Sequence, residues 1–275
     1  MKNQSVPFTK ITLFAAVSLA LCPPAQAVVP PPDGGYPGFT TAEGTNALKN
    51  LGTGVGNTGV GWHSLFTNSS GSYNTGAGTG TLVLNNADDN TAVGTAALLL
   101  NTTGNDNTAS GFQSLLSNTI GSSNTATGVF ALFSNTEGSN NTATGFQALA
   151  SNTTGSPNTA SGAFALFSNT EGNFNTANGV QALLSNISGG WNTAMGDSAL
   201  FSNTSGDDNT AIGHGALFNN FTGSDNVALG RFAGLNVESA NNVICIGHVG
   251  QNVSNSCYID NIWGVTSPGG LAVFR

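Results

Sequence analysis

One phrase repeats along most of this chain with a period of 17, and it constrains the fold more than any other feature. The consensus is N-T-A-x-G-x-x-A-L-x-x-N-T-x-G-x-x, in which Asn124 occupies position one and Gly128 position five. A fixed period of this kind predicts a solenoid, in which each repeat forms one coil and contacts only its neighbours. The position-five glycines recur at this period, with one step of 16, at Gly44, Gly61, Gly78, Gly94, Gly111, Gly128, Gly145, Gly162, Gly179, Gly196, Gly213, Gly230 and Gly247.

The coils are predicted to be built from β-strands. Glycine interrupts the consensus unit at positions five and fifteen, so a helix of ordinary length does not fit, whereas Thr, Val and small residues suit short strands. One coil has too little apolar surface to fold alone, so equivalent strands must pair in parallel and in register. We therefore predict an all-β parallel β-solenoid, or β-roll, of about thirteen coils.

Two columns of residues are predicted to face the core of the coils. Ala occupies position three in nine consecutive repeats, from Ala92 to Ala228, and Leu occupies position nine in ten, from Leu65 to Leu217. The Asn residues at positions one and twelve have two interpretations. They can stack into amide ladders that bond from coil to coil, or serve as turn residues, and both roles are compatible.

Position ten is apolar in most repeats, and its residues include Phe133, Phe167, Phe201 and Phe218. Adjacent residues of a strand point to opposite faces, so a buried position nine would leave position ten as an exposed stripe. Monomeric proteins rarely expose so long an apolar row. We therefore expect this stripe to be an oligomer seam, the alternative being an exposed apolar liability.

A second period, twice as long, lies within the first. Phe130 and Phe133 recur as Phe164 and Phe167, which indicates that two-coil units were duplicated. Large rings then alternate with smaller residues down one column, where an unbroken stack of Phe would overpack.

Residues 1–27 have the features of a secretory signal peptide. Lys2 and Lys10 precede the apolar run from Ile11 to Cys22, and small residues at Ala25 and Ala27 suit cleavage. The apolar run is too short for a membrane span, and Leu21 before Cys22 is a poor match to a lipoprotein signal, which requires a small residue there. We therefore expect export without a transmembrane or lipid anchor. The remaining domains are predicted as a Pro- and Gly-rich leader at 28–39, the repeat domain at 40–256 and an exit segment at 257–275.

The charge of the chain limits its partners. The formal net charge is −8, and loss of the signal peptide removes two of the five basic residues and none of the 13 acidic ones, giving 3 − 13 = −10. A basic nucleic-acid-binding patch is therefore excluded.

The exported form would keep two cysteines, Cys245 and Cys257, because Cys22 lies in the signal peptide. An even pair in an oxidising compartment predicts a disulfide as one alternative. The other alternative is two small side chains packed in the last coil, and only geometry can decide between them.

The motifs Asn209-Thr-Ala-Ile-Gly213 and Asn226-Val-Ala-Leu-Gly230, each followed by Ala at position eight, carry a resemblance. They are similar to the head repeats of trimeric autotransporter adhesins, the YadA-like heads, over about Thr40 to Gly250. That resemblance implies a left-handed β-roll and a homotrimer of three rolls packed side by side. Handedness follows from the resemblance alone.

A second resemblance covers the C-terminal end. The segments Ile244–Gly247 and Ser256–Gly264 look like the region that precedes endosialidase-type chaperone domains in tail-fibre-like surface proteins. The sequence ends at Arg275 before any such chaperone, stalk or membrane anchor. We expect either a fragment of a longer protein or partners that supply assembly and attachment.

Candidate chemistry is sparse, and we expect no metal, cofactor or catalytic site. His63, His214 and His248 do not sit in a metalloprotease spacing and are expected in turns or on the surface. The acid pairs Asp88-Asp89 and Asp207-Asp208 end a repeat and lack the several ligands of a calcium site.

Two classes of function remain. The first is an exported structural or adhesive surface protein that presents a repetitive β-roll to a host matrix protein or glycan. The second is a passive fibre or spacer segment of a larger surface or tail-fibre-like assembly. A carbohydrate-cleaving enzyme comes third, because that chemistry needs two carboxylates facing one groove, and the acids of this chain cluster in turns. We therefore expect a protein that is not an enzyme.

Overall fold

The computed structural model describes residues 38–260. Within them it contains fourteen short β-strands and no helix, which confirms the predicted all-β fold. The strands are β1 (Thr41–Glu43), β2 (Thr58–Val60), β3 (Thr75–Ala77), β4 (Thr91–Val93), β5 (Thr108–Ser110), β6 (Thr125–Thr127), β7 (Thr142–Thr144), β8 (Thr159–Ser161), β9 (Thr176–Asn178), β10 (Thr193–Met195), β11 (Thr210–Ile212), β12 (Val227–Leu229), β13 (Val243–Ile246) and β14 (Ser256–Ile259).

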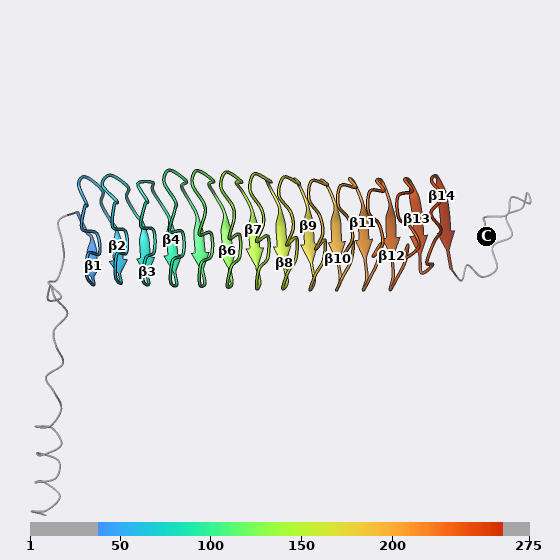
Figure 1. The fold of residues 1–275 in the computed structure, drawn as a ribbon, viewed down its shortest axis with the longest axis horizontal. Coiled ribbons are helices and arrows are strands. Elements are labelled where there is room, and N and C mark those ends of the chain that lie inside the picture. Colours follow the sequence, from blue (N-terminus) through green and yellow to red (C-terminus); the bar gives the residue numbers. More distant parts are fainter. Residues whose placement is uncertain (1–37, 261–275) are drawn as a thin grey trace, which may run out of the picture.

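All fourteen strands form one parallel sheet in sequence order. Consecutive strands pair in register, so that Thr125 of β6 lies beside Thr142 of β7 and Ala126 beside Ala143. The predicted β-solenoid of about thirteen coils is therefore confirmed, including the pairing of the segments that follow Asn124 and Asn141. Figure 1 shows the coils as a straight row, with every strand arrow on the same side.

The core lies between the sheet and a second layer formed by positions six to eleven. Ala126 at position three and Leu132 at position nine are both fully buried, as predicted. The equivalent residues of the other coils continue the two columns into one hydrophobic cluster from Leu48 to Cys245.

This second layer differs from the expected strand. Leu132 has a φ of 50° and Phe130 a φ of 58°, and the residues at positions seven and nine repeat this left-handed conformation along the chain. Because left-handed residues at positions seven and nine alternate with a residue of negative φ at position eight, Ala131 and Leu132 both reach the core although they are adjacent. The amide of Leu132 donates to the carbonyl of Ala148 at 3.0 Å, so the layer is still bonded from coil to coil.

Asn residues at positions one and twelve form two buried ladders. The side-chain amide of Asn124 donates to Oδ1 of Asn107 at 3.1 Å, and that of Asn135 donates to Oδ1 of Asn118 at 2.7 Å. Both Asn124 and Asn135 also donate to the carbonyl of Gly138, at 2.8 and 2.9 Å. These residues are therefore ladder and turn residues at once, and no buried side-chain polar atom in the described part of the chain lacks a partner.

The end of the solenoid departs from the period. Val243 of β13 pairs with Ser256 of β14, so the last coil is shorter than the others. The sheet continues to Ile259, past the predicted boundary at 256. The predicted signal peptide at 1–27, most of the leader and most of the exit segment lie outside the described residues.

Candidate binding faces

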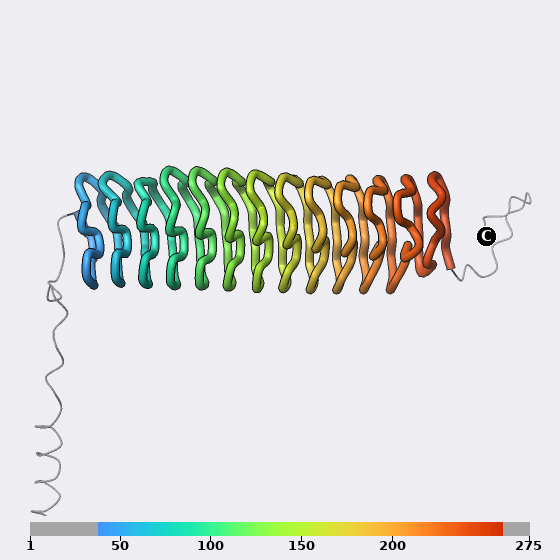
Figure 2. The backbone as a smooth tube through the Cα atoms, viewed as in Figure 1, coloured from blue at the N-terminus to red at the C-terminus, as the bar shows by residue number. Residues whose placement is uncertain are grey.

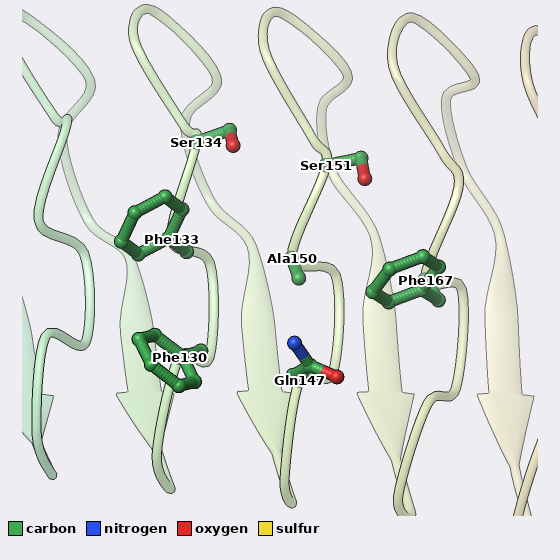
Figure 3. A pocket seen from close by; sticks show the side chains of 7 residues that line it. All are labelled: Phe130, Phe133, Ser134, Gln147, Ala150, Ser151 and Phe167. Atoms are coloured by element: carbon green, nitrogen blue, oxygen red, sulfur yellow. The ribbon is translucent and has the colours of Figure 1, made fainter.

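The two-layer coil presents two long surfaces to solvent, one on each side of the core. We call the outward side chains at positions two and four of the strands the threonine face. We call the side chains at positions six, seven and ten, on the opposite layer, the aromatic face. In Figure 3 the labelled rings of the aromatic face lie in front of the strand arrows.

Rings on the aromatic face touch in groups of three. Phe112 contacts Phe130 edge to face with centroids 5.4 Å apart, and Phe130 contacts Phe133 in the same way at 5.5 Å. The group recurs two coils later, where Phe164 contacts Phe146 at 5.2 Å and Phe167 at 5.8 Å. The two-coil period read from the sequence is therefore a period of ring clusters.

A hollow of about 230 Å³ separates the two clusters. It forms where Ala150 takes position ten between Phe133 and Phe167, as Figure 3 shows. Gln147 supplies an amide on the same coil. The full lining consists of Phe130, Phe133, Ser134, Gln147, Ala150, Ser151 and Phe167.

The predicted seam residues lie on this face but are half-buried rather than exposed. Phe133, Phe167, Phe201 and Phe218 pack against neighbouring side chains, and Phe201 stacks on Phe218 with centroids 4.8 Å apart. The physical reason is that position nine lies in a left-handed turn rather than a strand, so the ring at position ten packs against another ring of the same layer, as Phe133 does against Phe130. Exposed apolar area on this face comes instead from position six, where Phe112 and Phe146 are each 44% exposed.

The threonine face consists of short polar side chains in its middle portion. In β6 and β7 the side chains at positions two and four are exposed while the intervening Ala is buried. Towards the C-terminal end the face becomes apolar, with exposed Met195, Ile212 and Leu229 at position four. The change from polar to apolar residues at position four can be read in the sequence, but the repeat pattern alone does not show that positions two and four form one face and positions six, seven and ten the other.

The two cysteines are free thiols on opposite sides of the sheet. Cys245 is buried, whereas Cys257 is exposed and pairs in register with the exposed Ile244. The disulfide alternative is thus not the arrangement of this structure, because one side chain points into the core and the other away from it. Burial raises the pKa of Cys245 to about 11, and the nearby Cys257 contributes a smaller part of the increase. A backbone hydrogen bond with Gly234 partly offsets the shift.

The acid pairs serve the backbone of the preceding coil. Oδ1 of Asp88 accepts a hydrogen bond from the amide of Ser72, and Oδ1 of Asp207 accepts one from the amide of Gly190, each at 2.7 Å. Sequence reasoning missed this role. Position sixteen carries Asp, Ser or Asn in most coils, and that preference was the available signal.

The histidines lie in turns or bends, as expected. His214 is exposed, with Nε2 3.4 Å from Oδ1 of Asp197. His63 stacks on Trp62 with centroids 3.8 Å apart. Within residues 38–260, no three His, Cys, Asp or Glu side chains gather closely enough to hold a metal ion.

Two further findings concern membrane spans and similarity to known proteins. A search of the described residues for a helix long and apolar enough to cross a bilayer found none. No family model and no curated protein matches this sequence.

Proposed function

We propose that this chain is an exported structural or adhesive surface protein that presents a repetitive β-solenoid as a homotrimer. The aromatic face carries the proposal. Its cluster of Phe112, Phe130 and Phe133 recurs two coils later, and every coil has the same backbone register, so identical rods placed side by side would meet coil for coil. The resemblance of the repeats to YadA-like heads supports the same assembly.

We place the seam on the aromatic face around Phe133, Phe167, Phe201 and Phe218. The half-buried rings at position ten supply packed, rigid edges, and the exposed rings of Phe112 and Phe146 supply additional apolar area. Aromatic side chains contribute large contact areas at protein interfaces, which favours this face over one made of short polar side chains.

The test is the solution mass of the full chain by light scattering. The wild type is expected to be trimeric, and the triple variant Phe133→Ser, Phe167→Ser, Phe201→Ser monomeric with its circular dichroism largely retained. A matched control replaces Thr125, Thr142 and Thr159 by Ser on the opposite face and should keep the trimer mass. An unaltered mass in the Phe variant would place the seam elsewhere.

A monomeric wild type calls for one further experiment before the trimer is rejected. Three separate rods must be aligned before side-by-side packing can repay the cost of association. A trimeric coiled coil appended after Arg275 would supply that alignment. If small-angle scattering shows that the three solenoids of such a fusion stay apart, the proposed trimer is wrong.

Adhesion is supported by the repetition itself. Equivalent surfaces recur coil after coil, so weak contacts to a host matrix protein or glycan would act together as avidity. Binding arrays of matrix proteins and glycans test this role. A chain that binds none of them would instead be a passive fibre or spacer segment of a larger surface or tail-fibre-like assembly, which is the second candidate.

Export is tested separately by expressing the full chain in a bacterium with a Sec pathway. The exported protein is expected to begin at Val28 by mass spectrometry. Retention of an uncleaved chain in the cytoplasm would contradict this part of the proposal.

A further inference from the structure

The middle of the threonine face is a two-dimensional grid of hydroxyl groups. Position two is Thr in every strand from β5 to β9, and position four is Ser110, Thr127, Thr144, Ser161 and Asn178. The strands pair in register, so Thr125 lies beside Thr142 and Thr127 beside Thr144. Two straight files of mainly hydroxyl-bearing side chains therefore run along the rod.

The spacing of this grid is fixed by the backbone. Neighbouring strands of a sheet lie ~4.8 Å apart, and residues two apart on one strand are separated by ~6.7 Å. Most sheets twist and would blur such a grid over several strands. The coils here stack in a straight row, as Figure 2 shows, and their strands pair in register, so the grid repeats from coil to coil along the face.

The hydroxyls on this grid are not used by the protein. Those of Thr125, Thr127, Thr142 and Thr144 have no hydrogen-bond partner among the described residues. The threonines at position thirteen provide the contrast, because the hydroxyl of Thr119 donates to the carbonyl of Thr136 at 2.9 Å. Thr is also stiff at χ1, so the methyl and hydroxyl groups of each file are held in similar orientations.

The face is uncharged, although the chain carries a net charge of −8. Among the outward positions two and four from β2 to β13, the residues are Thr, Ser, Asn, Val, Ala, Met, Ile and Leu. A partner for this surface must be neutral, flat and periodic in two directions. A charged polymer has no counter-charge to meet here.

We propose that the threonine face of β5 to β9 binds ice. The two spacings of the hydroxyl grid are close to those between water oxygens that repeat on a prism face of hexagonal ice. Water held over the threonine methyl groups and bonded to the hydroxyls can therefore join the lattice at many points at once. Each contact is weak, but the rigid rod makes them simultaneously, so their free energies add after one association cost.

The experiment measures inhibition of ice recrystallisation and shaping of single ice crystals by the purified full chain. Wild type is expected to inhibit recrystallisation and to produce faceted crystals. Thr142→Lys, at the centre of the grid, should raise the required concentration roughly tenfold or more, because a charged side chain interrupts both the fit and the simultaneous contacts.

The matched control places the same charge outside both faces. Thr154 lies at position fourteen in an exposed bend, so Thr154→Lys should leave ice activity unchanged. Thermal unfolding by circular dichroism checks that both variants fold. The mild variants Thr125→Ser and Thr142→Ser, which keep the hydroxyls and remove the methyl groups, should weaken activity without any introduced charge.

Three outcomes would overturn the proposal. One is a wild type that neither shapes ice nor inhibits its recrystallisation. Another is an equal loss in Thr142→Lys and Thr154→Lys, which would make the effect a general property of the rod. The third is a chain in which Thr142→Cys forms disulfides between copies in the native oligomer, because a second copy would then cover the grid. Failure of the trimer seam on the opposite face would leave ice activity intact, so the two proposals fail independently.

Discussion

Asn152 donates a hydrogen bond of 2.7 Å from its side-chain amide to Oδ1 of Asn135, its equivalent in the preceding coil. Oδ1 of Asn152 in turn accepts a hydrogen bond of 2.8 Å from Asn169. All three side chains are buried, so the ladder is a continuous line of satisfied amides through the solenoid. The stability of each coil therefore depends on both neighbours.

Replacing Asn152 by Ala should destabilise the protein strongly. The change leaves Oδ1 of Asn135 buried without its donor, and it removes the acceptor of the Asn169 side-chain amide. A buried polar group without a partner costs about 1–3 kcal/mol. We therefore expect the free energy of unfolding to fall by about 2–4 kcal/mol. Chemical denaturation measures it. Thr154→Ala, in an exposed bend of the same coil, is the control and should change the free energy of unfolding by less than about 0.5 kcal/mol. Equal denaturation midpoints for the two variants would show that the ladder contributes little to stability.

Leu166→Ala should lower the free energy of unfolding by roughly 2 to 5 kcal/mol, because it opens a cavity in the Leu column. Asp208→Ala, in one of the acid pairs that the sequence places in turns, would be the simplest comparison. The structure makes Asp208 a poor control, since its φ is 56° and Asp tolerates this region better than Ala.

Glu171→Ala is the better comparison, because Glu171 is exposed and does not have a positive φ. It should cost under about 0.5 kcal/mol in the same denaturation series. Similar losses for Leu166→Ala and Glu171→Ala would mean that the assignment of inside and outside is wrong.

Gly145→Ala should be among the most damaging substitutions in the chain. The φ of Gly145 is 136°, and an added Cβ would lie 2.6 Å from the carbonyl oxygen of Gly162 in the next coil. Strain and overpacking each cost about 1–3 kcal/mol, so we expect a combined loss of about 2–6 kcal/mol.

Gly80→Ala provides a matched control for that change. Gly80 also has a positive φ, of 66°, but the nearest atom to an added Cβ would be 3.8 Å away. Its equivalent in the next coil is already an alanine, Ala96, with a φ of 58°. Thermal unfolding should therefore show a small change for Gly80→Ala and a large one for Gly145→Ala, and the reverse order would contradict the close packing of the position-five glycines.

The two thiols should differ in reactivity. In a chain with Cys22→Ser, a thiol reagent is expected to modify the exposed Cys257 in the native state and to reach the buried Cys245 only after unfolding. Mass spectrometry of the labelled protein locates the label. A label on native Cys245, or a Cys245 to Cys257 disulfide in the exported protein, would contradict the arrangement on opposite faces.

The buried thiol also predicts a loss of stability at alkaline pH. The folded state keeps Cys245 protonated with a pKa raised to about 11, whereas the thiol of the unfolded chain ionises at its ordinary pKa of 9.0. The stabilisation is fully present below the lower pKa and is lost as the pH rises through the higher one. Denaturation midpoints measured as the pH rises from the lower of these two pKa values towards the higher should fall less steeply in Cys245→Ala than in the parent protein.

The repeat by itself determined the architecture. A period of 17 with recurrent Ala at position three and Leu at position nine is compatible with little other than coils stacked in register, and the pairing of Thr125 with Thr142 follows from it. The Asn columns could also be anticipated as ladders, because identical side chains at a coil spacing have donors and acceptors that face each other.

Only the tertiary structure decided the conformation at position nine and the orientation of the last strand. Leu132 adopts a left-handed φ that its own preference opposes, because its amide bonds to the next coil and its side chain fills the core. Cys257 points outward because the shortened last coil aligns it with Ile244 rather than with Cys245. Both outcomes depend on contacts between coils, which local sequence preference does not contain.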